Sequence, residues 1–254
     1  MIIFCFYVII TYIMKLIYIV MFFNLIFSIN IRLNYKYFLK EDFKNLKSWE
    51  SVLFYKTDKP TIFTILSKKS NNILSVKSID SASGIVFRDA ANTYNDEIIT
   101  WRWKVNIYPT TKTEGEKYFD DYALRIMVIF KFDTNNLSFF DNIKYNVAKL
   151  VYPKFPPHSV INYIWLSRKA KEKIYDNPYF YNSKNIVLKT ILDKTNTWYI
   201  EQVDLVEDYI KAFKEKPPKE YAVIIFSDSD STHSSALSFI DYFYIRNNND
   251  KKNL

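Results

Sequence analysis

The sequence predicts an all-β fold, a jelly-roll-like β-sandwich with one or two short helices. Many short runs alternate apolar and polar residues with period two or are continuously apolar, and polar turn residues bound them. Aromatic residues make up 19% of the 254 residues, with 21 Tyr and 21 Phe. Aromatic rings suit pleated, half-buried surfaces, so this excess also favours strands. Patterns of this kind are typical of sandwiches and jelly rolls.

The expected strands run through most of the chain after residue 60. They are Thr61–Leu66, Asn72–Ser78, Gly84–Arg88, Glu97–Ile107, Tyr122–Phe132, Ser159–Leu166, Asn185–Leu192, Trp198–Val203, Tyr221–Phe226 and Ala236–Ile245. Phe38–Trp49 is expected to form a short helix or a loop. The period-two patterns therefore predict a single sandwich domain over residues 31–246, followed by a disordered tail over residues 247–254.

One segment between the strands has helical spacing. Val206, Tyr209, Ile210 and Phe213 are expected to share one face of a short helix. Asp204 is expected to cap its N-terminus, and the pair Pro217–Pro218 excludes its continuation.

The first thirty residues predict a signal peptide or a membrane anchor. Met1–Ile29 is apolar apart from a few residues, which include Lys15. As one spanning segment it would bury Lys15 near mid-span, at a cost of about 2.5–3.5 kcal/mol. Translation from Met14 would instead give a basic start followed by an apolar run of signal-peptide length, and we favour this second interpretation. Both interpretations predict an exported protein of the periplasm or cell envelope, with the membrane as a partner of the N-terminal segment.

The composition excludes several classes of site. With 2 Gly, the chain cannot build a glycine-rich phosphate loop or a dinucleotide fingerprint. With 1 Cys and 2 His, thiol and transition-metal chemistry have few ligands. The net charge of +8 is spread along the chain rather than clustered, so nucleic acid is not an expected partner.

Two expected strands carry arginines opposite their bulky side chains. In Thr100–Val105 the tryptophans and Val105 share one face, and Arg102 lies on the other. In Asp121–Val128, Tyr122 is expected on the face of Leu124 and Ile126, with Arg125 opposite. If both strands belong to one sheet, the two arginines line a common polar surface, and Asp120, Asp121 or Asp228 could pair with them. Guanidinium groups there would bind carboxylate, phosphate or sugar hydroxyls.

Several short motifs occur in a fixed order along the chain. They are Ser81–Ile85, Trp101–Val105, Asp120–Arg125, Ile161–Trp165, Ser167–Lys171, Trp198–Glu201, Val206–Tyr209, Pro217–Pro218 and Ala222–Thr232. In this order they resemble domain-of-unknown-function family 3047, from about residue 36 to residue 246. The resemblance implies an exported bacterial envelope protein with a fold similar to galactose-binding-like or carbohydrate-binding jelly rolls. It implies no established activity.

Asp228, Asp230 and Thr232 follow a buried strand and predict an oxygen-rich site for calcium. The EF-hand pattern fails, because His233 occupies the glycine position and Phe239 the glutamate position. Calcium is the one cofactor considered, and no catalytic residue is assigned.

The sequence favours a non-catalytic module that binds a glycan or another polar envelope ligand. Arginines and acids would hydrogen-bond hydroxyl groups, and Trp165 would stack on a sugar ring. The candidate ligand-binding residues are Arg102, Asp121, Arg125, Asn162, Trp165, Arg168, Asp228 and Asp230. Two alternatives stay open: a scaffold protein without a small ligand, and a hydrolase of envelope glycans that uses Asp121, Asp228 or Asp230.

Overall fold

The computed structural model describes residues 37–53, 59–68, 71–109, 121–134, 137–138, 142, 145–146, 156–178 and 182–247. Contacts divide the chain into residues 1–35 and 36–254, and all the described residues belong to the second unit. The expected leader and most of the expected tail lie outside the described residues. Within the part of the chain that is described, no helix is long and apolar enough to cross a membrane.

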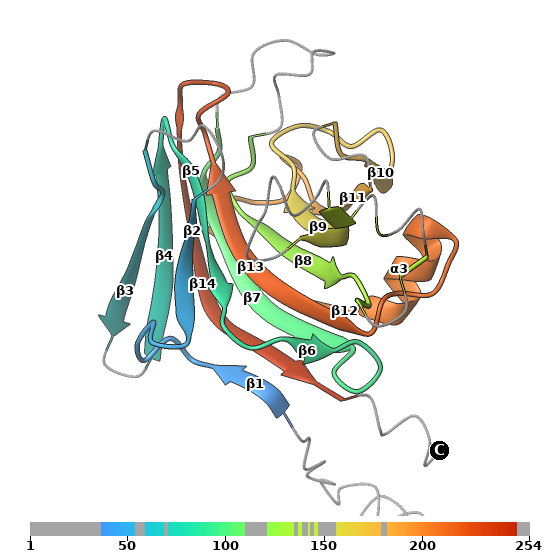
Figure 1. The fold of residues 1–254 in the computed structure, drawn as a ribbon. Helices are drawn as coiled ribbons and strands as arrows, with labels where there is room; N and C mark the ends of the chain where they lie inside the picture. The colour runs from blue at the N-terminus through green and yellow to red at the C-terminus, as the bar shows by residue number, and fades with distance from the viewer. Residues whose placement is uncertain are drawn as a thin grey trace, which may run out of the picture. The chain divides into compact units, whose positions relative to one another are not determined.

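The described unit contains two sheets (Figure 1). The first has six strands in the order β12 (Tyr199–Asp204), β7 (Ile98–Ile107), β14 (Ser235–Arg246), β4 (Asn71–Ile79) and β3 (Ile62–Lys68), with β1 (Tyr37–Glu41) also paired to β14. The second has the order β10 (Ile174–Asp176), β11 (Ser183–Lys189), β9 (Pro157–Trp165), β8 (Arg125–Lys131), β13 (Glu220–Asp228), β5 (Ala82–Phe87) and β2 (Trp49–Leu53), with β6 (Ala91–Asn92) paired to β13. All described pairs are antiparallel except β11 with β9.

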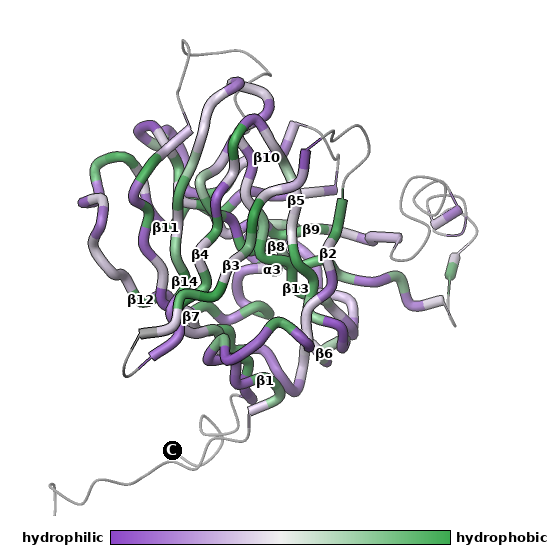
Figure 2. Tube along the Cα trace, turned by 90° about the vertical axis from the view of Figure 1, so that its left-hand side faces the viewer, coloured by the Kyte–Doolittle hydropathy of each residue, from purple (hydrophilic) through white to green (hydrophobic). Residues whose placement is uncertain are grey.

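The core lies between the two sheets. Trp101 and Trp103 of β7 are fully buried, as are Tyr163 and Trp165 of β9 in the other sheet. Their rings meet across the interface, with centroids 5.7 Å apart for Trp101 and Tyr163 and 5.4 Å apart for Trp103 and Trp165. The buried Trp101, Trp103 and Val105 alternate along β7 with the half-buried Arg102 and Lys104, and Figure 2 shows hydrophobic stretches in elements such as β3 and β8. The predicted sandwich and the predicted inward face of β7 are therefore confirmed.

The predicted helix is present as α3 (Leu205–Phe213). The Asp204 side chain accepts hydrogen bonds from the backbone N–H groups of Val206 and Glu207, at 3.1 Å each, as an N-cap does. The predicted face was partly wrong. Tyr209 is buried together with Leu205 and Ala212, at positions i, i+4 and i+7 of one helical face, and this face leaves Ile210 43% exposed.

Two local expectations were wrong. Phe38–Trp49 contains strand β1, a loop and the first residue of β2, because each short strand pairs with a longer one that the local pattern does not reveal. Strand β8 begins at Arg125, so Tyr122 precedes it. Tyr122 does not share the face of Leu124 and Ile126: it packs in a separate cluster outside the main core, with Ile164 among its neighbours.

Gly84 in β5 marks a close approach between strands. A Cβ atom at this position would lie 2.5 Å from Ile224 Cγ2 and 2.9 Å from the backbone oxygen of Ile225 in β13. We expect Gly84→Ala to lower the free energy of unfolding by about 1–3 kcal/mol, since the backbone must shift. Denaturant unfolding measures the change, and Thr64→Ala, at an exposed position of β3, is the control. Equal stability of the two variants would contradict this packing.

Candidate functional site

The two arginines predicted to share a surface lie in different sheets. Arg102 belongs to β7 in the six-stranded sheet, and Arg125 belongs to β8 in the eight-stranded sheet. Each has its own aspartate, Asp241 for Arg102 and Asp228 for Arg125. The expected common polar surface is therefore wrong, because the two strands are neighbours in neither sheet. The predicted pairing of an arginine with Asp228 is confirmed for Arg125.

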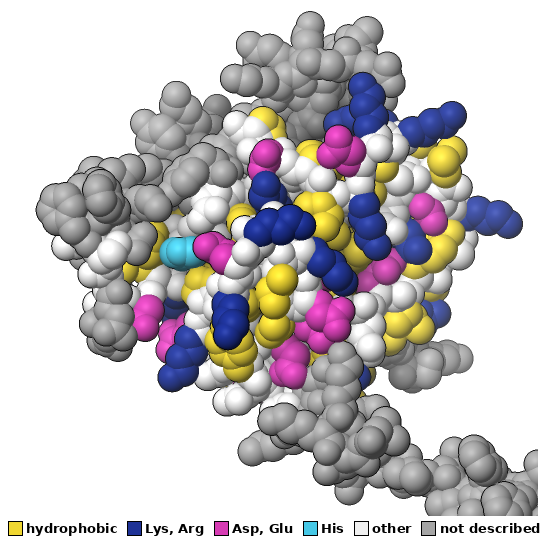
Figure 3. Space-filling model, turned by 90° about the vertical axis from the view of Figure 1, so that its right-hand side faces the viewer, with side chains coloured by type: hydrophobic (Ala, Val, Ile, Leu, Met, Phe, Trp, Pro, Cys, Tyr) yellow, Lys and Arg dark blue, Asp and Glu magenta, His cyan; other side chains and the backbone are white. Residues whose placement is uncertain are grey.

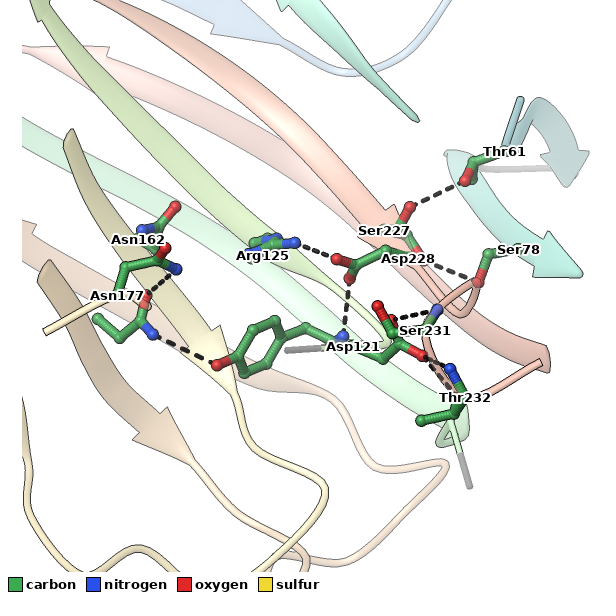
Figure 4. A network of polar contacts seen from close by, with 12 residues as sticks. Thr61, Ser78, Asp121, Arg125, Asn162, Asn177, Ser227, Asp228, Ser231 and Thr232 are labelled. Carbon is green, nitrogen blue, oxygen red and sulfur yellow. Dashed lines mark hydrogen bonds and ion pairs between the residues drawn. The ribbon is translucent and has the colours of Figure 1, made fainter. Parts of the chain in front are cut away.

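The Arg125 cluster is buried (Figure 4). The Arg125 guanidinium bonds the Asp228 carboxylate, and the two side chains are 9% and 8% exposed. Asp228 also accepts a hydrogen bond from the backbone N–H of Tyr122 at 2.7 Å. The guanidinium lies 4.5 Å from the ring centroid of Phe226 and 4.8 Å from that of Tyr122. A buried ion pair is tolerated when both charged groups have close hydrogen-bonding partners. Here the Arg125–Asp228 pair fixes the start of β8 to the end of β13.

Asp121 joins this cluster through the turn that follows β13. It accepts hydrogen bonds from the backbone N–H of Thr232 at 2.8 Å and from the Thr232 hydroxyl at 2.5 Å. The backbone N–H of Ser231 donates to it at 3.3 Å. Burial raises the pKa of Asp121, the Thr232 hydrogen bonds oppose that rise, and the charge of Asp230 adds to it. The turn is therefore held by a carboxylate that is costly to ionise.

Three carboxylates meet beside Arg125. Asp121, Asp228 and Asp230 each offer an oxygen atom within 4.8 Å of the others, and Asp230 is the least buried of the three. Clustered carboxylate oxygens are the ligands that calcium prefers. The expected ligand Thr232 donates its hydroxyl to Asp121, and Asp121 joins Asp228 and Asp230 as a further candidate ligand. Calcium binding at this cluster stays a prediction.

Calcium is expected to stabilise the protein if this cluster binds it. At about 1 mM calcium, a dissociation constant of about 10⁻⁴–10⁻³ M gives about 0.5–1.5 kcal/mol by mass action. The melting temperature should rise with calcium and fall again with EDTA. Asp230→Asn keeps the hydrogen bonds that Asp121 and Asp228 accept from Thr232 and Tyr122 and should abolish the rise, whereas Asp176→Asn on an exposed strand should not. An equal rise in both variants would exclude this cluster as the site.

Three other predicted residues follow β9 or lie in it. Asn162 is 1% exposed, and its Nδ2 donates to Ser183 Oγ at 2.9 Å, while its Oδ1 has no hydrogen-bond partner. Trp165 is 0% exposed and donates its ring N–H to the backbone oxygen of Thr190 at 3.1 Å. The expected stacking of Trp165 on a sugar is therefore wrong, because both ring faces lie in the core. Arg168 is half-buried in the irregular segment after β9.

Arg102 occupies a more accessible surface. Its Nη1 donates to Asp241 Oδ2 at 2.7 Å, and the two side chains are 37% and 6% exposed. Asn71 Nδ2 also donates to Asp241. Asp241 lies where the register of β14 against β7 shifts, between Ile240 and Tyr242. This bulge gives β14 one extra residue and places the carboxylate beside Arg102, on the side facing away from the core.

Aromatic rings lie beside Arg102 and the neighbouring Lys104. The Arg102 guanidinium lies 5.1 Å from the ring centroid of Trp198, and Lys104 Nζ lies 5.2 Å from the same centroid. Lys104 Nζ also lies 4.8 Å from the ring of Phe239. We define the Arg102 face by the following residues of the six-stranded sheet and the chain just before β12: Arg102, Lys104, Trp198, Phe239, Asp241 and Tyr242. Of these, only Arg102 was predicted from the sequence as a site residue.

One feature of the sequence could have indicated Phe239, Asp241 and Tyr242 as site residues. Phe239 and Tyr242 face outward with Arg102, although their spacing of three residues cannot fit an uninterrupted strand. An acidic residue lies between them at Asp241, next to the inward Ile240. An interruption of the in–out alternation next to a charged residue indicates a bulge. It does not identify which strand carries the ion-pair partner of that residue.

A different distribution of charge is seen on the side where β10, β11 and α3 lie. Figure 3 shows Lys and Arg side chains interspersed with Asp and Glu there. Two of the pairs are Lys184 with Asp176 at 2.6 Å and Lys211 with Glu207 at 3.4 Å. Exposed pairs of this kind contribute little to stability and are usual on a solvated surface. The expectation that nucleic acid is not a partner stays a prediction.

Comparison with known protein families gives one match over most of the chain. The family described as Protein of unknown function (DUF3047) matches residues 47–244. The chain belongs to this family. The resemblance found in the order of the sequence motifs is thereby confirmed, and no curated protein matches the chain.

Several solved structures are similar to this DUF3047 protein. A family 11 carbohydrate-binding module of a Clostridium thermocellum cellulosomal cellulase is 10% identical, covers 84% of this chain and 94% of its own, and has a TM-score of 0.38. Endoglucanase 3 of Trichoderma harzianum, from family GH12, is 8% identical, and the match covers 86% of this chain and 100% of the endoglucanase chain, with a TM-score of 0.41. Winged bean acidic lectin, complexed with methyl-α-D-galactose, is 9% identical, covers 78% and 98%, and has a TM-score of 0.34. No residue or ligand is transferred from these proteins.

Proposed function

We propose that this protein is a non-catalytic module that binds a glycan or a similarly polar ligand on the Arg102 face. The observation that carries the proposal is the Arg102–Asp241 pair, fixed at 2.7 Å beside the half-buried ring of Trp198. A sugar presents hydroxyl groups that need donors and acceptors in fixed positions, and C–H faces that pack on aromatic rings. The Arg102 face supplies both kinds of contact on one surface.

The geometry of the pair suits this role. A guanidinium carries five N–H donors, and the bond to Asp241 through Nη1 leaves others on a side chain that is 37% exposed. Asp241 is buried and is held by Asn71 as well as by Arg102, so it fixes the guanidinium in place before a ligand arrives. Preorganised partners reduce the entropic cost of binding.

The buried Arg125 cluster is less suited to contact a ligand. Its charged groups are almost fully enclosed and are paired with one another and with backbone N–H groups. A hydrolase would need two carboxylates facing a substrate across about 5–10 Å. We assign the cluster to holding β8, β13 and the following turn together. The proposal includes export to the cell envelope, supported by the apolar sequence of residues 1–29.

The proposal predicts that single substitutions on the Arg102 face weaken glycan binding. A panel of soluble glycans is screened with the purified protein, and the dissociation constant of each ligand found is measured by isothermal titration calorimetry. Arg102→Ala and Trp198→Ala are each expected to raise it about tenfold or more, since a loss of about 1.4 kcal/mol is tenfold in affinity.

The matched control is Arg88→Ala. Arg88 is an exposed arginine paired with Glu50 at 3.5 Å, and both belong to the region of β2 and β5 in the other sheet. Its substitution should leave the affinity unchanged. Unchanged affinity in the folded Arg102 and Trp198 variants would refute the proposed face, and no binding across the panel would favour the scaffold alternative.

A further inference from the structure

Among the described residues, the central strands of the six-stranded sheet carry more basic than acidic side chains on their outward side. On these three strands, β4, β7 and β14, the described side chains that alternate away from the core include four basic groups and one carboxylate. The basic residues are Lys77, Arg102, Lys104 and Arg246, and the acidic residue is Asp241. Asp241 is already bonded to Arg102. The ligand that complements this surface is therefore negatively charged.

Two of these cations converge on one place. Arg102 and Lys104 are separated by one residue on β7, so their side chains leave the same face about 7 Å apart along the strand. Both lie close to the ring of Trp198, at 5.1 and 5.2 Å from its centroid. The negative face of the indole partly offsets the repulsion between two neighbouring cations. An anionic group that reaches both of them would offset it further.

The chemistry of the two cations also narrows the ligand. A guanidinium presents parallel N–H groups that match a carboxylate, and an ammonium adds a compact charge with freely rotating donors. Lys104 Nζ is oriented by Asn196 Oδ1 at 2.8 Å. Asp241 is buried and already accepts hydrogen bonds from Arg102 and Asn71, so it fixes the guanidinium rather than contacting the ligand. A sugar ring that packs on Trp198 and carries a carboxylate to the two cations describes a uronic acid.

We propose that the ligand of the Arg102 face is a uronate-containing glycan, whose carboxylate lies between Arg102 and Lys104. This inference rests on the proposed function, which locates glycan binding on the same face. The sugar ring contacts Trp198, and Asp241 keeps the Arg102 guanidinium in place. The positive charge of the face raises the rate of encounter with an acidic chain, and added salt weakens the interaction.

The test compares two glycans that differ in charge alone. An oligogalacturonide and its carboxyl-reduced, neutral counterpart are titrated into the full-length protein by calorimetry at low and at high salt. The acidic glycan is expected to bind about tenfold tighter or more at low salt, and this preference should shrink at high salt. Equal affinity for the two glycans would overturn the uronate inference while leaving the proposed function intact.

Substitutions test whether Arg102 and Lys104 cause the preference for the acidic glycan. Lys104→Gln keeps the Arg102–Asp241 pair and should reduce the preference several-fold, and Arg102→Lys keeps the charge but removes the planar fork and should also reduce it. Arg88→Gln, in the exposed pair with Glu50, should leave it unchanged. An undiminished preference in the Lys104 and Arg102 variants would overturn the assignment. If one variant folds poorly, the other still tests it.

Two further outcomes are distinguished. Dextran sulfate that binds as tightly as the oligogalacturonide, with no effect of Lys104→Gln or Arg102→Lys, would indicate unspecific attraction of polyanions and overturn the inference. If neither oligogalacturonide nor its reduced form binds, the inference fails. The proposed function fails with it only when the whole neutral and acidic panel also fails.

Discussion

The structure depends on the aromatic contact between its two sheets. Trp101 and Trp103 of β7 meet Tyr163 and Trp165 of β9, and all four side chains are fully buried. Because side chains alternate along a strand, these inward rings determine which neighbours face away from the core. Arg102 and Lys104 are therefore directed outward from β7. The surface that we propose for binding is thus a consequence of how the core is packed.

The two arginine–aspartate pairs have the same chemistry but differ in burial, and this difference gives them different roles. Arg125 and Asp228 are both almost fully enclosed, so their bond has to offset the desolvation of two charges and serves mainly to join strands. Arg102 is more than a third exposed, while its partner Asp241 is buried and held by Asn71. This second pair combines a fixed acceptor with an accessible donor. Such an arrangement favours ligand binding over a purely structural role.

The bulge in β14 connects the fold to the candidate site. The extra residue between Ile240 and Tyr242 allows Ile240 to face the core and places Asp241 on the opposite side. Without the bulge, strict alternation would reverse the direction of every side chain after Ile240. The core contacts of Phe243 and the outward position of Tyr242 both depend on this one insertion.

The sequence by itself determined the class of fold, most strands, the Asp204 cap of α3 and the outward direction of Arg102. These depend on period-two and helical spacing and on local hydrogen bonds, which the order of residues specifies directly. Only the tertiary structure decided that Arg102 and Arg125 lie in different sheets, that Trp165 is enclosed, and that Asp241 is the partner of Arg102. Residues 102 and 241 are far apart in the chain, and strand order and a bulge bring them together. No local pattern contains that information.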